Sequence, residues 1–232
     1  MITIKIDRRK SYKAILDTET CPMDREVEGV DPFNMWVYDL GWQIADKKGN
    51  VEVERSYVNA DIFLNEKIAM TSSYYAEKIP KYWEDIKAGK RILTSFYNIR
   101  KQLLEDMETY NVKEVYAFNM RFDYNSLNNT QRWLTKSKYR YFFPKGIMIC
   151  DIMKMARDVI AKTPSYKRFC IENGYLTKND RCKLTAETVF RYIMQDTSFV
   201  ESHTGLEDVK IETIIMAYCY RKHKKMRKAL FN

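Results

Sequence analysis

The chain has 232 residues, of which 45% are hydrophobic and 14% aromatic, so residues 1–232 can bury a full core as a single domain. Only seven glycines and five prolines occur, and no segment is typical of a flexible linker or a disordered tail. The formal net charge of +9 indicates attraction to polyanions, of which nucleic acid is the commonest for a basic domain; a merely solvated basic surface is the alternative.

Three consecutive strands are predicted in the first part of the chain. Residues 13–18 form a short apolar run that leads into a pair of carboxylates. Residues 35–46 and 51–58 are rich in apolar and alternating residues and flank a Lys-Lys-Gly-Asn turn at 47–50, which is typical of a β-hairpin. We expect these three strands to be antiparallel.

Helices and strands alternate after the hairpin. The spacing of apolar residues predicts helices at 74–87, 94–110, 124–134, 151–161 and 184–194, and a final helix that begins near 203–206 and continues into the basic segment 221–228. Asp151 is expected to cap its helix rather than to bind a metal. Short β-rich runs predict strands at 112–118 and 147–150. This order predicts an α/β domain whose mixed five-stranded sheet, three antiparallel strands followed by parallel ones, is flanked by helices.

Asp17 and Glu19 end the first strand and lie two residues apart, so both side chains point to the same face. Carboxylate oxygens are the ligands that Mg²⁺ and Mn²⁺ prefer. Hydrolysis of a phosphodiester by two such ions requires carboxylates that place them about 4 Å apart. An isolated Asp-x-Glu pair is more often solvated, so the prediction of a metal site depends on further acids.

Asp123, His203 and Asp208 supply the remaining groups. Asp123 follows the strand predicted at 112–118, and His203 lies five residues before Asp208, which places both near one side of the first turns of the last helix. Histidine has an unperturbed pKa of about 6.5 and is suited to accept a proton from water. A capping or surface position is the alternative for His203, and a surface position is expected for the other histidine, His223.

Three segments of the chain resemble the motifs of the DEDDh exonucleases, which include polymerase proofreading subunits, oligoribonuclease-like proteins and ribonuclease T. Ile15–Thr20 (ILDTET) resembles the first motif, Asn119-x-x-Phe122-Asp123 the second, and His203-Thr-Gly-Leu-Glu-Asp208 the third. The resemblance extends from about residue 13 to 220. It implies a ribonuclease H-like fold and a 3'→5' exonuclease that releases nucleoside 5'-monophosphates from single-stranded DNA or short RNA by a two-metal mechanism.

The resemblance also implies a role for each matched residue. Asp17 would bridge two divalent ions, Mg²⁺ or Mn²⁺; Glu19 and Asp208 would complete the ion on the side of the nucleophile. Asp123 would support the other ion through water, and His203 would act as the general base. The implied substrate-binding residues are Thr18, Met23, Asn119 and Phe122.

The chain departs from the first motif after Thr20. Cys21-Pro22-Met23 stands where the family often has Thr-Gly and an apolar residue, and a long polar insert follows at 24–34. The contacts with the terminal base are therefore open. Met23 is equally compatible with a loop or core methionine, and Asn119 with a residue that closes a turn.

Two segments mix aromatic and cationic residues, as do surfaces on which unpaired bases stack. One spans residues 74–83. The other, which we favour because it follows Asp123, combines Lys136, Lys138, Arg140 and Lys145 with Tyr139, Tyr141, Phe142 and Phe143. Ordinary packing of the aromatic residues is the alternative for both segments.

The remaining features concern location and partners. The five cysteines form no disulfide framework or CxxC pair, and no signal peptide or membrane span is evident, so a cytoplasmic protein is expected. The lysine-rich, glycine-poor composition resembles that of phage or mobile-element proteins, which implies the host cytoplasm. Expected partners are 3' ends of DNA or RNA and replication proteins. The competing hypothesis is a catalytically weak nucleic-acid-binding or polymerase-associated module on the same fold.

Overall fold

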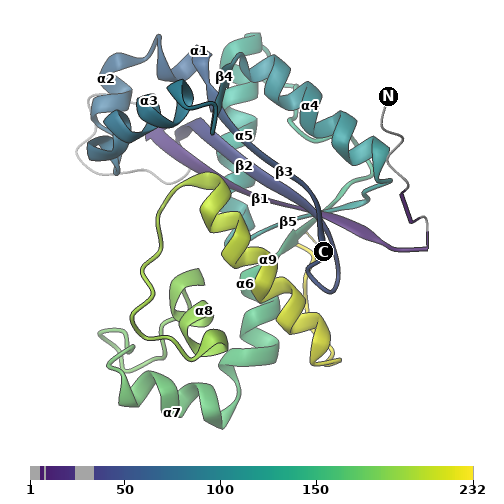
Figure 1. Cartoon of the computed structure of the whole chain (residues 1–232), viewed down its shortest axis with the longest axis vertical. Helices are drawn as coiled ribbons and strands as arrows, with labels where there is room; N and C mark the ends of the chain where they lie inside the picture. The colour runs from purple at the N-terminus through teal and green to yellow at the C-terminus, as the bar shows by residue number, and fades with distance from the viewer. Residues whose placement is uncertain (1–5, 8, 24–33, 232) are drawn as a thin grey trace.

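The computed structural model describes residues 6–7, 9–23 and 34–231. Its centre is a six-stranded mixed sheet of order β4-β3-β2-β1-β5-β6 (Figure 1). The strands are β1 (Tyr12–Pro22), β2 (Met35–Asp46), β3 (Val51–Asn59), β4 (Ile92–Thr94), β5 (Glu114–Ala117) and β6 (Met148–Asp151). β2 pairs with β1 and with β3, in both cases antiparallel. The other three pairs are parallel: β4 with β3, β5 with β1, and β6 with β5. The mixed α/β sheet is confirmed; it has one strand more than expected, because β4 is a three-residue edge strand too short to show alternation.

Helices flank this sheet on both faces (Figure 1). They are α1 (Ala60–Phe63), α2 (Lys67–Thr71), η1 (Ala76–Lys78), α3 (Ile79–Lys87), α4 (Phe96–Thr109), α5 (Met120–Thr135), α6 (Ile152–Ala156), the π-helical turn η2 (Arg157–Ala161), α7 (Pro164–Glu172), α8 (Ala186–Met194) and α9 (Gly205–Arg221). None of the helices in the described ranges is long and apolar enough to cross a membrane. The predicted cap is confirmed: the Asp151 side chain accepts a hydrogen bond from the Met153 backbone N–H at 2.8 Å.

Two predicted helices differ from the structure. The helix expected at 74–87 is divided into η1 and α3, and Pro80 lies in the first turn of α3, where its missing N–H costs nothing. The expected continuation of the last helix through 221–228 is wrong, because α9 ends at Arg221. The chain instead turns back along the edge of β6, where the Leu230 N–H donates to the Ile149 carbonyl at 2.8 Å. This pairing covers part of an open sheet edge.

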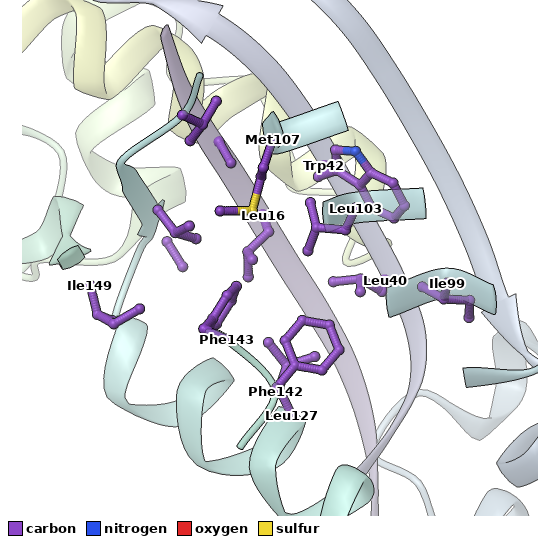
Figure 2. Close-up of a cluster of buried hydrophobic side chains, with 14 of the residues drawn as sticks. Leu16, Leu40, Trp42, Ile99, Leu103, Met107, Leu127, Phe142, Phe143 and Ile149 are labelled. Atoms are coloured by element: carbon purple, nitrogen blue, oxygen red, sulfur yellow. The ribbon is translucent and has the colours of Figure 1, made fainter. Parts of the chain in front are cut away.

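Successive side chains of β1 point to opposite faces of the sheet and pack in two separate cores. Leu16 packs with Trp42 of β2 and with Leu103 and Met107 of α4 on one face (Figure 2). Ile15 points to the other face and packs with α6 to α9. Asp17 and Glu19 continue the odd-numbered series, so strand geometry directs them to the face that α9 covers.

A third apolar cluster closes the end of the sheet at which α1, α2 and α3 pack. Tyr38 of β2 contacts Phe63 of α1 and Tyr82 of α3 there. Met23 is half-buried against this cluster, in keeping with the core alternative for this residue. The polar insert expected at 24–34 lies, except for Asn34, outside the described residues.

Candidate active site

A pocket of about 320 Å³ opens where β1, α5 and α9 meet. It is lined by all five predicted catalytic and metal-binding residues, namely Asp17, Glu19, Asp123, His203 and Asp208. The other lining residues are Thr18, Tyr75, Phe118, Asn119, Phe122, Met153, Leu184, Thr185, Ala186, Glu201 and Glu212. Segments separated by almost two hundred positions in the sequence therefore contribute to one site.

Asp17, Glu19 and Asp208 form the tightest group in this pocket. One carboxylate oxygen from each lies within 4.8 Å of the others. The group depends on a close approach between α9 and the sheet, since a methyl group added to Gly205 would lie 2.8 Å from the backbone nitrogen of Gly41. Glycine at both positions lets the first turn of α9 rest on the strand backbone, which brings Asp208 up to β1.

Asp123 lies in the first turn of α5 rather than at the end of β5. Asn119 makes the turn between the two elements with a left-handed φ of 66°, a conformation that asparagine tolerates better than most residues. The carboxylate of Asp123 is fixed by Thr18, whose backbone N–H and hydroxyl both donate to Oδ1, at 3.2 and 2.8 Å. One oxygen of Asp123 is thus oriented by β1.

His203 precedes α9 and is not part of it, contrary to the expectation of a shared helix with Asp208. Its backbone φ is 50°, and its imidazole stacks on the ring of Tyr75 with centroids 4.6 Å apart. Lys78 lies over the Tyr75 ring at 4.1 Å and donates to the carbonyl of Ser202 at 2.6 Å. The segment around η1 therefore holds the histidine loop beside the pocket.

Burial raises the pKa of the carboxyl groups in this pocket. The pKa of Asp123 rises to about 7 and that of Asp208 to about 8, in each case mainly through desolvation. Desolvation and the negative charge of Glu212 raise the pKa of Asp17 well above its ordinary value. Such a cluster resists ionisation until a cation neutralises it.

The pKa of His203 moves in the opposite direction. Partial burial, and then the positive charge of Lys78, lower it below the ordinary value for histidine. The side chain is 38% exposed, and its Nδ1 lies 3.9 Å from a carboxylate oxygen of Glu201. A neutral imidazole at the edge of the pocket is in the protonation state that a base needs.

The residue types and their surroundings fit a divalent cation. Oxygen ligands from several carboxylates suit Mg²⁺ or Mn²⁺. Within the described ranges, no lysine or arginine forms an ion pair with Asp17, Glu19, Asp123, Asp208 or Glu212. The negative charge of the cluster is therefore available to a bound ion.

Not all of the predicted substrate-binding residues lie in the pocket. Thr18, Asn119 and Phe122 line the pocket, whereas Met23 does not. Thr18 directs its hydroxyl to Asp123, and the Asn119 backbone N–H donates to Asp151 at 3.2 Å.

The two aromatic and cationic segments also have different roles. Phe142 and Phe143 of the favoured segment belong to the core, while Tyr139 and Tyr141 are exposed. The segment that reaches the pocket is the other one, through Tyr75.

Sequence reasoning did not identify Glu201 and Glu212, two further acids of the pocket, and it included Tyr75 only as part of the segment 74–83. Glu212 could have been found, because it lies four residues after Asp208 and therefore on the same face of α9. Glu201 lies two residues before His203 in a loop without a periodic pattern, and burial raises its pKa to about 7. Tyr75 reaches His203 only through tertiary packing.

Comparison with known proteins places the fold among solved nuclease structures. No protein-family model matches the chain, and no curated protein matches it. A full-length 3'-exonuclease is 14% identical with a TM-score of 0.57, over 97% of this chain and 66% of that chain. Exonuclease I of E. coli in complex with a dT13 oligonucleotide is 11% identical with a TM-score of 0.52, over 93% and 41%.

Exonuclease I of Methylocaldum szegediense gives a similar result, with 12% identity, a TM-score of 0.52 and coverage of 92% and 41%. The chain therefore spans about two thirds of the first structure and less than half of the two Exonuclease I chains. What it shares with them is the ribonuclease H-like fold, a mixed sheet flanked by helices.

Proposed function

We propose that this chain is a metal-dependent 3'→5' exonuclease of the DEDDh type. Its substrate would be the 3' end of single-stranded DNA or short RNA, and its products nucleoside 5'-monophosphates. The observation that carries the proposal is the convergence of Asp17, Glu19, Asp123 and Asp208 on one pocket, with His203 at its edge. The likeness of the fold to solved 3'-exonucleases supports the same conclusion.

Asp17, Glu19 and Asp208 are the residues that would hold one divalent ion, since their oxygens already converge. Asp17 and Asp123 would hold the second. Bound Mg²⁺ or Mn²⁺ would lower the pKa of a water molecule and stabilise negative charge on the phosphate. The two hydrogen bonds from Thr18 fix the orientation of the Asp123 carboxylate.

His203 would take the proton from the attacking water. Its lowered pKa keeps the imidazole neutral at physiological pH. The stack on Tyr75 restricts the ring to one plane, and Lys78 holds the adjoining backbone. Tyr74, which is 77% exposed and packs edge-on against Tyr75, offers a ring on which a base near the 3' end could stack.

A binding module without catalysis explains the pocket less well. Buried carboxylates that repel one another destabilise the folded chain when no cation is bound. A surface that only binds nucleic acid gains nothing from negative charges, because they repel phosphates. The acids are explained by a cation-dependent reaction.

The proposal is tested with 5'-labelled single-stranded DNA and RNA oligonucleotides in the presence of Mg²⁺ or Mn²⁺. The wild-type chain should give a ladder that shortens from the 3' end, and the ladder should disappear with chelator, with Asp17→Asn and with His203→Ala. Uncut oligonucleotides retained in a gel shift would instead support the binding module and contradict the proposal.

A further inference from the structure

Glu212 is a buried carboxylate that the residue roles described above do not use. It lies on α9, one helical turn after Asp208, and is 2% exposed. It lines the same pocket as Asp17 and Asp123. Its position on α9 therefore carries a further negative charge into the acid cluster.

The two oxygens of Glu212 have different surroundings. The backbone of Phe118, at the point where the chain leaves β5, faces the carboxylate and lowers its pKa. Its Oε2 is buried and has no hydrogen-bond partner among the described residues. A buried polar atom without a partner destabilises the folded chain, and more so when it is charged.

A group that faces the Phe118 backbone need not be a carboxylate. The side-chain carbonyl of glutamine could face the Phe118 backbone in the same way without adding a charge next to Asp17 and Asp123. Glu212 interacts unfavourably with both: among the carboxylates it has the largest raising effect on the pKa of Asp17, and Asp123 is the main charge that raises the pKa of Glu212 after burial itself. A cation in contact with the unpartnered oxygen would offset this repulsion.

We infer that Glu212 is a fifth carboxylate ligand of the site and holds the second divalent ion together with Asp17 and Asp123. This inference rests on the proposed function and adds a ligand to it. Asp17, Glu19 and Asp208 form one ligand group. Without Glu212, the second ion would have only Asp17 and Asp123, and one oxygen of Asp123 already accepts two hydrogen bonds from Thr18.

The test is calorimetric titration of the whole metal-free chain with Mn²⁺, in the absence of nucleic acid. The wild type should bind two ions per chain, and Glu212→Gln should bind one, or the second at least tenfold more weakly. Glu172→Gln, which removes an exposed carboxylate from α7, is the matched control and should bind as the wild type does. Equal stoichiometry and affinity in the wild type and Glu212→Gln would overturn the inference.

Thermal melting provides a second readout that does not depend on activity. In chelator, Glu212→Gln should melt at the same temperature as the wild type or higher, because a buried repulsion is removed and the Phe118 contact is kept. Saturating Mn²⁺ should then raise its melting temperature less than that of the wild type. A lower melting temperature in chelator with an unchanged gain from Mn²⁺ would assign Glu212 a purely structural role.

Glu212→Asp keeps the charge but withdraws the oxygens by one methylene, and it should also weaken the second ion. A wild-type chain that binds no Mn²⁺ at all would contradict the proposed function itself. A chain that digests oligonucleotides in Mn²⁺ but shows no effect of Glu212→Gln on binding would contradict only the role of Glu212.

Discussion

Asp39 accepts a hydrogen bond from the backbone N–H of Gly205 at 3.0 Å, and this contact joins the first turn of α9 to β2. Asp39 lies directly opposite Glu19 in the β1–β2 pairing and is fully buried. Arg91, at 2.9 Å, and Tyr82, at 2.7 Å, complete its surroundings. Asp39, opposite Glu19, therefore acts as an anchor for the helix that carries Asp208.

The close approach at Gly205 leads to the first prediction. Alanine in a helix is usually more stable than glycine by about 1 kcal/mol, so helix propensity alone predicts that Gly205→Ala is stabilising. We expect the opposite, a loss of roughly 1–3 kcal/mol, because the new methyl group would collide with the Gly41 backbone. Chemical denaturation measures the change, and activity should fall with it. A variant as stable and active as the wild type would show that α9 does not rest on β2.

The raised pKa values predict a pH dependence of stability in the absence of metal. A carboxyl group with a folded-state pKa above its unfolded value destabilises the fold once it must ionise, so stability falls as pH rises. For Asp123, with a pKa of about 7, and Asp208, with about 8, this loss begins above the ordinary aspartate pKa and is complete near pH 8, so a substantial part of it falls between pH 5.5 and 8. The melting temperature in chelator should drop by several degrees across this range.

Mn²⁺ should reduce that drop, because it neutralises the ionised cluster. Asp208→Asn, which cannot ionise, should show a shallower pH dependence in chelator than the wild type. The lowered pKa of His203 makes stability rise with pH, but this is the effect of one group against that of several acids. A melting temperature that rises steadily from pH 5.5 to 8 in chelator would contradict the burial of these carboxyl groups.

Tyr75 is expected to position His203 through the ring stack. Tyr75→Ala should lower kcat about tenfold or more, while KM changes less, because the imidazole loses its fixed plane. Tyr75→Phe keeps the stack and should retain most of the activity. Tyr97→Ala removes an exposed tyrosine on α4 that does not line the pocket, and it serves as the control. Equal kinetics for Tyr75→Ala and Tyr97→Ala would exclude this positioning role.

Variants of Thr18 distinguish two possible roles of this residue, the orientation of Asp123 and direct contact with the substrate. Its hydroxyl donates to Asp123 at 2.8 Å, so Thr18→Val should lower kcat and weaken Mn²⁺ binding, whereas Thr18→Ser should restore both. A direct substrate contact, which the sequence motif implied, predicts instead a raised KM with unchanged Mn²⁺ binding. Steady-state kinetics and calorimetry on the two variants separate these outcomes.

Local patterns in the sequence were sufficient for much of the fold. The hairpin of β2 and β3 and the helix α4 appear where alternation, the turn residues and apolar spacing predicted them. Ser95 caps α4 through its side chain, as a helix start of this kind requires. β4 was missed because three residues do not establish a period, and the basic segment 222–228 lacks the apolar stripe that would have fixed a helix.

The candidate site was predictable where its residues belong to short motifs, and less so where tertiary packing supplies them. The five motif residues do meet in one pocket. Tyr75 and Lys78 lie beside His203 through tertiary packing, because they precede α3, which the third apolar cluster holds at that end of the sheet. The motif spacing also placed His203 on the helix of Asp208, while its left-handed φ of 50° puts it in the preceding loop.

In the proposed function, the acid cluster directs water onto the terminal phosphodiester at a 3' end. The most direct test is digestion of a short oligonucleotide of defined sequence with Mn²⁺ in ¹⁸O-labelled water, with the first products identified by mass spectrometry. We predict that the 3'-terminal nucleoside 5'-monophosphate appears first and carries ¹⁸O on its phosphate. Release from the 5' end, a monophosphate without ¹⁸O, or no release at all by a folded, Mn²⁺-bound chain would contradict the proposed 3'→5' exonuclease.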